Sequence, residues 1–258
     1  MARDRYEAVA RRSDHRRPAT RSTSVARVVR VVRVALASLG LITAPAMVLV
    51  GTAAASMTAH ATLATAREAL LVPSDFPASW TSTKSTNDNS PMPGAAQIAS
   101  CIGVPRSVIT RNPPNVNSPE FDAPNQLLAV DDTVSIYPSA HAATTDFTSL
   151  ANPKTPGCLA RVVNGSARAT IEKSFGAASL VGPIRVTRTA SAYFAPGSAN
   201  FTMTMELKEK GVQLMLTATL VDYVKGNEEQ TLTLISVESG FPAALAMQLT
   251  QDAKSRLQ

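Results

Sequence analysis

Near residue 200 the chain alternates strictly between apolar and polar side chains. Over residues 200–207 every second position is apolar. Successive side chains of a β-strand point to opposite faces, so this segment is predicted to be a strand with one apolar face and one threonine-rich face. The apolar positions are Phe201, Met203, Met205 and Leu207.

Two hairpins are predicted to follow this strand, because apolar residues should meet across each pair of strands. A four-residue connection after Leu207 pairs that residue with Val212. For the second hairpin, a loop of odd length at residues 225–227 sets Leu220 beside Leu232. The three strands are therefore expected to form an antiparallel meander with one apolar face.

Toward the C-terminus apolar residues recur at every fourth position, which is the spacing of one face of an α-helix. Pro242 fits the first turn of such a helix. We expect the helix to cover the apolar face of the meander and to place Leu249 against Met205. Its apolar positions are Phe241, Leu245, Leu249, Ala253 and Leu257.

Shorter patterns predict the remaining elements between residues 62 and 200. A strand over residues 127–137 leads into a helix that begins near Ser139. The segment 111–124 contains four prolines and is expected to be an exposed, flexible connection. Helices are predicted over 94–102 and 158–175, with a break at 164–165, and a strand over 183–191.

Together these elements predict an α+β fold. We expect an antiparallel sheet of about five to seven strands with helices packed on one face. One transmembrane or signal-anchor helix is expected to precede it.

That helix is predicted from residues 34–59, which contain no charged side chain. At about 1.5 Å per residue, a helix of this length exceeds the thickness of a hydrocarbon core. The alternative is a signal peptide that is cleaved after Ala55 or Ala61, which would release a secreted domain. The predicted organisation is a basic tail (1–33), an anchor (34–59) and an extracytoplasmic domain (62–258).

The basic residues are concentrated before this apolar segment. Residues 1–33 hold ten arginines against three acids, whereas residues 34–258 are almost neutral. Arg27, Arg30 and Arg33 precede the span directly, so the tail is expected to stay in the cytoplasm. These arginines are favoured as a topology signal, and contact with anionic lipid headgroups is the alternative role. A globally basic surface for nucleic acid is excluded, and the expected partner is the lipid bilayer.

The chain contains two cysteines, Cys101 and Cys158. In an exported domain they are expected to form a disulfide, because oxidation is favoured outside the cytoplasm. Such a bridge would stabilise the domain by about 4 kcal/mol in the chain-entropy model. Two free buried thiols are the alternative. No metal site is expected, because two cysteines and one nearby histidine supply too few ligands.

No combination of residues indicates catalysis. His141 lies five residues before Asp146, which places the two side chains on different faces of the predicted helix. A nucleophile elbow, a phosphate-binding glycine loop and a dinucleotide fingerprint are absent from the sequence. We therefore expect no enzymatic activity and no cofactor.

The sequence contains two acidic pairs that resemble chemical sites. Asp131 and Asp132 are adjacent on a predicted strand, so their side chains face opposite sides and are expected to be turn or edge charges. Glu228 and Glu229 are expected to be solvated at the tip of a hairpin.

Several short motifs resemble a known group of proteins. The residues 70–80 read LLVPSDFPASW, and ASCIG follows at 99–103, VSIYPS at 134–139 and FPAALA at 241–246. Over residues 68–257 the chain resembles exported domains of actinobacterial envelope proteins, including mycobacterial lipoproteins and the extracellular sensor domains of mycobacterial Ser/Thr kinases. The resemblance implies an α+β fold and a ligand-sensing or envelope-binding role, and it implies no active site.

The sequence therefore favours a non-enzymatic, membrane-tethered extracytoplasmic domain that binds a cell-envelope ligand or a protein partner. A structural or assembly component of an envelope complex is the second hypothesis. An exported enzyme is the third, and converging titratable residues with shifted pKa values would favour it.

Overall fold

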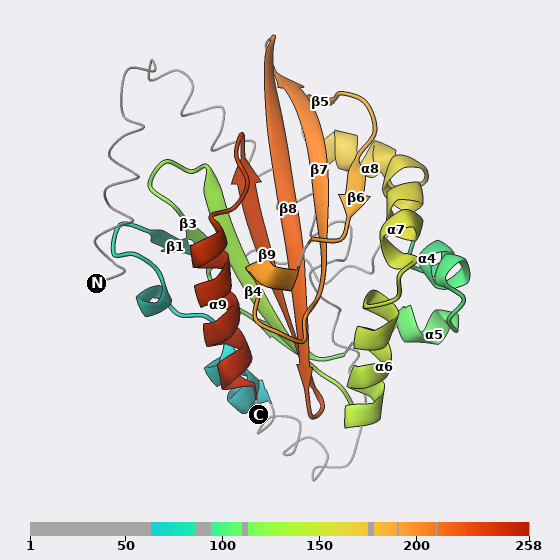
Figure 1. Ribbon diagram of the computed structural model, residues 1–258, viewed down its shortest axis with the longest axis vertical. Coiled ribbons are helices and arrows are strands. Elements are labelled where there is room, and N and C mark those ends of the chain that lie inside the picture. Colours follow the sequence, from blue (N-terminus) through green and yellow to red (C-terminus); the bar gives the residue numbers. More distant parts are fainter. Residues whose placement is uncertain are drawn as a thin grey trace.

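The computed structural model describes most of the chain beyond residue 62, and its centre is an antiparallel sheet with helices on both faces (Figure 1). The predicted tail and anchor, with Arg27, Arg30 and Arg33, lie outside the described residues. Within the described residues, every helix is too short or too polar to span a lipid bilayer. The described ranges are 63–85, 94–109, 113–174, 178–189, 191–209 and 211–257.

In this part of the chain the sheet has nine strands in the order β1-β3-β4-β9-β8-β7-β5, with β2 paired to β4 and β6 paired to β7. All of these pairings are antiparallel. The strands are β1 (Thr81–Thr83), β2 (Asn115–Asn117), β3 (Glu120–Asp122), β4 (Leu128–Ile136), β5 (Ser179–Leu180), β6 (Arg185–Thr187), β7 (Ala199–Glu209), β8 (Val212–Lys225) and β9 (Glu228–Val237).

The helices belong to two groups that pack on opposite faces of the sheet. A helical segment over 63–69 precedes the first short strand. The others are α4 (Ala95–Ile102), α5 (Arg106–Ile109), α6 (Ala140–Leu150), α7 (Thr155–Asn164), α8 (Arg168–Ser174) and α9 (Ala243–Arg256), with 3₁₀ turns η1 (Pro73–Asp75) and η2 (Ser191–Tyr193).

The alternating segment near residue 200 is confirmed as strand β7, and its apolar side chains are buried. The expected register of the following hairpin is wrong. Glu209 pairs with Val212, so two residues connect the strands, and Leu207 pairs with Leu214. Gly211 has a φ of 82°, a left-handed conformation that tight hairpins require. A shift of two residues keeps each side chain on its face, so the hydrophobic pattern fits both registers equally.

The second hairpin differs by one residue from the expected register. Lys225 pairs with Glu228, so the connection again has two residues, and Leu220 pairs with Thr233 instead of Leu232. Leu232 therefore faces the opposite side of the sheet from Leu220. Strand β9 is buried along most of its length on both faces, so its apolar residues do not alternate and do not define a register.

The first face of the sheet packs against α4, α7 and α8. Its core contains the apolar side of β7, the matching residues of β8, and apolar residues from the three helices. Representative members are Phe201, Met203, Met205, Leu216, Ile98, Leu159 and Ile171.

The second face carries a separate core, and this corrects the expectation that helices cover one face only. α9 packs here, against Val130, Val221 and Leu232, and not against Met205 as the sequence suggested. Figure 1 shows α9 on the side of the sheet opposite to α4 and α7. The helical segment 63–69 contributes Ala66 and Ala69 to this second core.

The predicted disulfide is confirmed. Cys101 in the last turn of α4 is bonded to Cys158 in the first part of α7, with Cα atoms 5.7 Å apart. The bridge therefore joins two helices of the first face.

The proline-rich segment 111–124 is not simply an exposed connection. Within its described part, β2 and β3 both pair with β4. Val116 and Phe121 are buried, and the ring of Phe121 stacks on Phe76 with centroids 4.1 Å apart. Apolar residues every few positions anchor this segment to the sheet despite its prolines.

Candidate functional site

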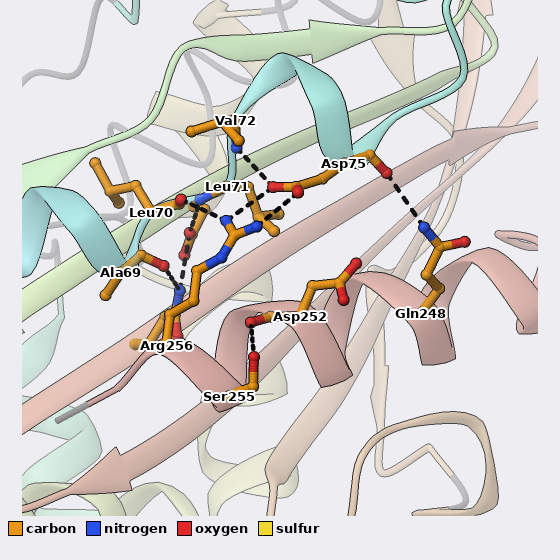
Figure 2. A network of polar contacts seen from close by, with 11 residues as sticks. Ala69, Leu70, Leu71, Val72, Asp75, Gln248, Asp252, Ser255 and Arg256 are labelled. Atoms are coloured by element: carbon orange, nitrogen blue, oxygen red, sulfur yellow. Dashed lines mark hydrogen bonds and ion pairs between the residues drawn. The ribbon is translucent and has the colours of Figure 1, made fainter.

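The first described residues of the chain dock onto the C-terminal helix and the middle of the sheet. Leu71 is completely buried, and Phe76 is almost so. Figure 2 shows the side chain of Arg256 reaching from α9 toward the turn that contains Leu70 and Asp75. We call residues 63–76 the entry segment, because they connect the predicted anchor to the folded domain.

A bidentate ion pair fixes the turn of the entry segment. Arg256 donates from Nη2 to Asp75 Oδ1 at 2.6 Å and from Nη1 to Asp75 Oδ2 at 2.8 Å. The same guanidinium donates to the carbonyl of Leu70 at 2.8 Å. Hydrogen bonds to Asp75 raise the pKa of Arg256 above its usual range. Such two-point geometry holds a turn more specifically than a single contact.

The backbone of the same turn is bonded as well. The backbone N–H of Val72 donates to Asp75 Oδ2 at 2.7 Å, and Gln248 of α9 donates to the Asp75 carbonyl at 3.3 Å. The entry segment is therefore tied to α9 through side-chain and main-chain groups together (Figure 2).

A second connection runs from the entry segment into the centre of the sheet. The carboxylate of Asp132 is fully buried, and its Oδ2 accepts hydrogen bonds from Leu71 N and Gln230 Nε2, both at 2.9 Å. Gln230 Nε2 also donates to the carbonyl of Ala69 at 3.1 Å. Burial raises the pKa of Asp132 to about 7, although these hydrogen bonds act in the opposite direction.

An open groove of about 540 Å³ lies beside the entry segment. One wall belongs to the entry segment and the other to the stretch around β2. Arg67 and Lys84 are the charged residues of its lining, and both are exposed. We call it the entry groove. It is lined by Arg67, Leu70, Leu71, Val72, Lys84, Ser85, Asn115, Val116, Asn117, Ser118 and Pro119.

The chemistry of the entry groove suits an anionic, hydroxyl-bearing molecule. Two cationic side chains attract negative charge, and the amides and hydroxyls around β2 can exchange hydrogen bonds with a polar ligand. The apolar floor at Leu70 and Val72 can accept an apolar portion of the same molecule.

A separate group of acidic side chains lies between α6 and the sheet. Asp222 and Glu229 are buried there, and the hydroxyl of Tyr137 forms hydrogen bonds with Glu229 and with Asp146 of α6. Burial raises the pKa of Asp222 to about 7, and burial also raises the pKa of Glu229 well above its usual value. We call these four residues the acidic cluster.

Both acidic pairs of the sequence are therefore in places that the sequence did not indicate. Asp131 and Asp132 lie in the central strand β4 and are buried on opposite faces, instead of being turn or edge charges. Glu228 and Glu229 are buried as well, although they begin β9 next to a hairpin turn. His141 is exposed on α6.

Among the described residues, no three histidine, cysteine or carboxylate side chains are placed to hold one metal ion. The acidic cluster is instead arranged to retain protons, because Asp222 and Glu229 each have one carboxylate oxygen without a hydrogen-bond partner. Protonation of such a group removes the cost of a buried charge.

The sequence contained a signal for these contacts that pattern analysis did not use. Asp132 interrupts an apolar run in a strand that is otherwise read as buried. A polar residue in such a run marks a buried hydrogen-bond network. Its partners, the backbone groups of Ala69 and Leu71, have no signature in the sequence.

Comparisons with known proteins show distant structural similarity. No protein-family model matches the chain. No curated protein matches it either. Among solved structures, the chain is similar to the extracellular domain of PknH from Mycobacterium tuberculosis, with 12% sequence identity and a TM-score of 0.31. The match covers 54% of this chain and 61% of that domain, which is less than two thirds of its length.

Proposed function

We propose that the protein is a membrane-tethered, extracytoplasmic domain that binds an anionic cell-envelope molecule in the entry groove without converting it chemically. The observation that carries the proposal is the position of this groove. One of its walls is the entry segment, which leads directly to the apolar stretch 34–59. A ligand in the groove therefore contacts the same residues that connect the domain to its predicted anchor.

The two hydrogen-bonded connections of the entry segment support a sensing role. Asp75 is held by Arg256, and Leu71 is held by Asp132 in the middle of the sheet. A ligand that contacts Arg67 or Leu70 acts on a segment whose other contacts join it to α9 and to the sheet. Binding is thereby coupled to the geometry of the tether.

The disulfide supports the extracytoplasmic location. Cys101 and Cys158 form a bond that persists in oxidising compartments and is rare in the cytoplasm. The ligand class follows from Arg67 and Lys84, which favour a phosphate or carboxylate on a glycan or a glycolipid.

The proposal is tested by purifying the full-length protein from native membranes and identifying bound small molecules by mass spectrometry. We expect an anionic glycan or glycolipid with the wild-type protein and its loss from the double variant Arg67→Glu, Lys84→Glu. The matched control is Lys173→Glu with Arg185→Glu, which reverses two exposed charges outside the groove and should retain the ligand.

Release of the molecule by base or lipase treatment distinguishes a glycolipid from a free glycan. An anionic molecule that stays bound to the Arg67→Glu, Lys84→Glu variant shows that the entry groove is not the site. If the wild-type protein carries no anionic molecule and binds none from a total envelope extract, the proposed function is wrong.

A further inference from the structure

The disulfide lies at the surface of the first face, in a groove of its own. Cys101 is partly exposed, whereas Cys158 is 3% exposed. Together they line an open groove of about 580 Å³ between α4 and α7, which we call the disulfide groove. Its other lining residues are Ala96, Gln97, Ser100, Arg161, Val162, Gly165 and Ser166.

Arg161 supplies the charge of the disulfide groove. Its Nη1 donates to Cys101 Sγ at 3.7 Å, and the other lining residues are uncharged. A guanidinium at this distance attracts anions to the sulfur of Cys101, because the groove holds no carboxylate to neutralise it. The same charge stabilises a thiolate that approaches this sulfur.

The two cysteines of the bridge differ in exposure and in electrostatic environment, and both differences bear on thiol exchange. Cys101 is partly exposed and lines the groove, so an attacking thiolate can approach it, whereas Cys158 is buried. Cys158 lies in the first turn of α7, where the positive end of the helix dipole stabilises a departing thiolate. Attack at Cys101 with Cys158 as the leaving group is thus favoured by access and by electrostatics.

We propose that the disulfide groove is a thiol-exchange site for a small thiol that carries a carboxylate, and that the adduct forms on Cys101. The thiolate sulfur of the small molecule bonds to Cys101 Sγ while the bond between Cys101 and Cys158 breaks. The electron pair of that bond goes to Cys158 Sγ, which then takes a proton from water. The products are a mixed disulfide on Cys101 and a free thiol at Cys158, and the small thiol is the only co-reactant.

The fold is expected to survive this step. Ile98 and Ile102 of α4 are buried in the core of the first face, and Leu159 and Val163 hold α7 in the same core. Opening the bridge therefore frees the end of α4 without removing either helix from the sheet. This inference does not depend on the entry groove or its ligand.

The test measures the exchange rate of the native, full-length protein with three thiols: 3-mercaptopropionate, 2-mercaptoethanol and cysteamine. Each rate constant is expressed per concentration of thiolate. For each thiol, the wild-type rate constant is divided by that of Arg161→Gln, so differences in intrinsic reactivity between the thiols cancel. We expect Arg161 to favour the anionic thiol over the cationic one by about five-fold, the effect of one nearby charge at a protein surface. Arg161→Lys should retain most of this preference.

Arg168→Gln is the matched control, because Arg168 pairs with Glu172 on α8 and does not line the groove. Peptide mapping should place the adduct on Cys101. If Arg161→Gln fails to fold, the wild-type preference is measured between low and high salt, and it should decrease as salt screens the charge.

Three results would each overturn the inference. The first is an adduct on Cys158 instead of Cys101. The second is a rate that does not depend on thiol concentration, which would mean that the bridge reacts only after global unfolding. The third is an equal relative rate for the anionic and the cationic thiol in the wild-type protein at low salt.

Discussion

At the residue scale, buried carboxyl groups determine how the domain responds to pH. Burial raises the pKa of Asp132 and of Asp222 to about 7, and it raises the pKa of Glu229 in the same direction. The unfolded chain has carboxyl pKa values of about 4. Between these values the folded protein binds more protons than the unfolded chain, so its stability decreases as pH rises through about 7.

The first prediction follows from this decrease in stability with rising pH. The free energy of unfolding, measured with urea, should be larger at pH 5.5 than at pH 8. The variant Asp222→Asn should reduce this difference, because it removes one group that must lose its proton above pH 7 while keeping an acceptor for the hydroxyl of Thr231. A protein that is equally stable at both pH values would contradict the assignment of protonated carboxyls.

The second prediction concerns the hydrogen bonds of Asp132. Asp132→Asn keeps an acceptor for Leu71 N and Gln230 Nε2, so the change in stability should be below about 1 kcal/mol at pH 5.5. Asp132→Leu leaves Leu71 N buried without an acceptor and removes one of the two acceptors of Gln230 Nε2, so it should cost about 2 to 4 kcal/mol. Urea unfolding of both variants measures this. Equal losses would show that side-chain volume matters at this position and hydrogen bonding does not.

At the scale of elements, α9 and the entry segment depend on each other. α9 fills the second face of the sheet with Leu245 and Leu249, and its last turn carries the Arg256 that fixes Asp75. The helix is thus a packing element along its length and a clamp at its end. Two predictions separate these roles.

The third prediction tests where α9 packs. Leu249 is completely buried, so Leu249→Ala should cost about 2 to 5 kcal/mol. In double-mutant cycles, Leu249→Ala should couple to Leu232→Ala, which belongs to the same core, and should be additive with Met205→Ala on the other face. Met215→Ala is the control, because Met215 is 52% exposed and should change stability little. Coupling to Met205 would place α9 on the first face.

The fourth prediction tests the clamp. Arg256→Gln removes the bidentate pair with Asp75, and the loss should be about 1 kcal/mol because the guanidinium is partly exposed. Amide hydrogen exchange should increase at residues 70–76 more than elsewhere. Arg168→Gln breaks a surface pair of similar length on α8 and should leave exchange at 70–76 unchanged. If both variants give the same exchange pattern, Arg256 does not hold the entry segment.

At the scale of the whole molecule, the entry segment belongs to the core and is not a linker in front of it. Leu71 and Phe76 are buried in the second face, and their removal would expose Asp132 together with apolar surface. Under the proposed function, this integration is the route by which a ligand in the entry groove would act on the predicted anchor. It also gives a prediction about domain boundaries.

The fifth prediction compares two truncated proteins. A fragment that begins at residue 63 should unfold cooperatively, whereas one that begins at residue 77 should be strongly destabilised because it lacks Leu71 and Phe76. Thermal unfolding followed by circular dichroism measures the difference. Equal midpoints would mean that the segment is a dispensable linker and would remove the structural basis for coupling.

The sequence by itself determined the elements that one strong local pattern defines. The alternation over 200–207, the four-residue spacing after Phe241 and the capping serine at 139 each appear in the structure as β7, α9 and the start of α6. The disulfide was also predictable, since an exported chain with two cysteines has one simple way to pair them. The interactions that determine these elements lie within a short segment. The disulfide pairing follows from the number of cysteines.

Only the tertiary structure decided which faces meet and which polar groups are buried. A two-residue shift in the β7–β8 hairpin leaves the apolar pattern unchanged, and β9 is apolar on both faces, so neither register follows from the sequence. α9 fits either apolar face by pattern, and it lies on the face that the entry segment also covers. Asp132 is buried because distant backbone groups at Ala69 and Leu71 complete its network, and such long-range partners leave no local periodicity.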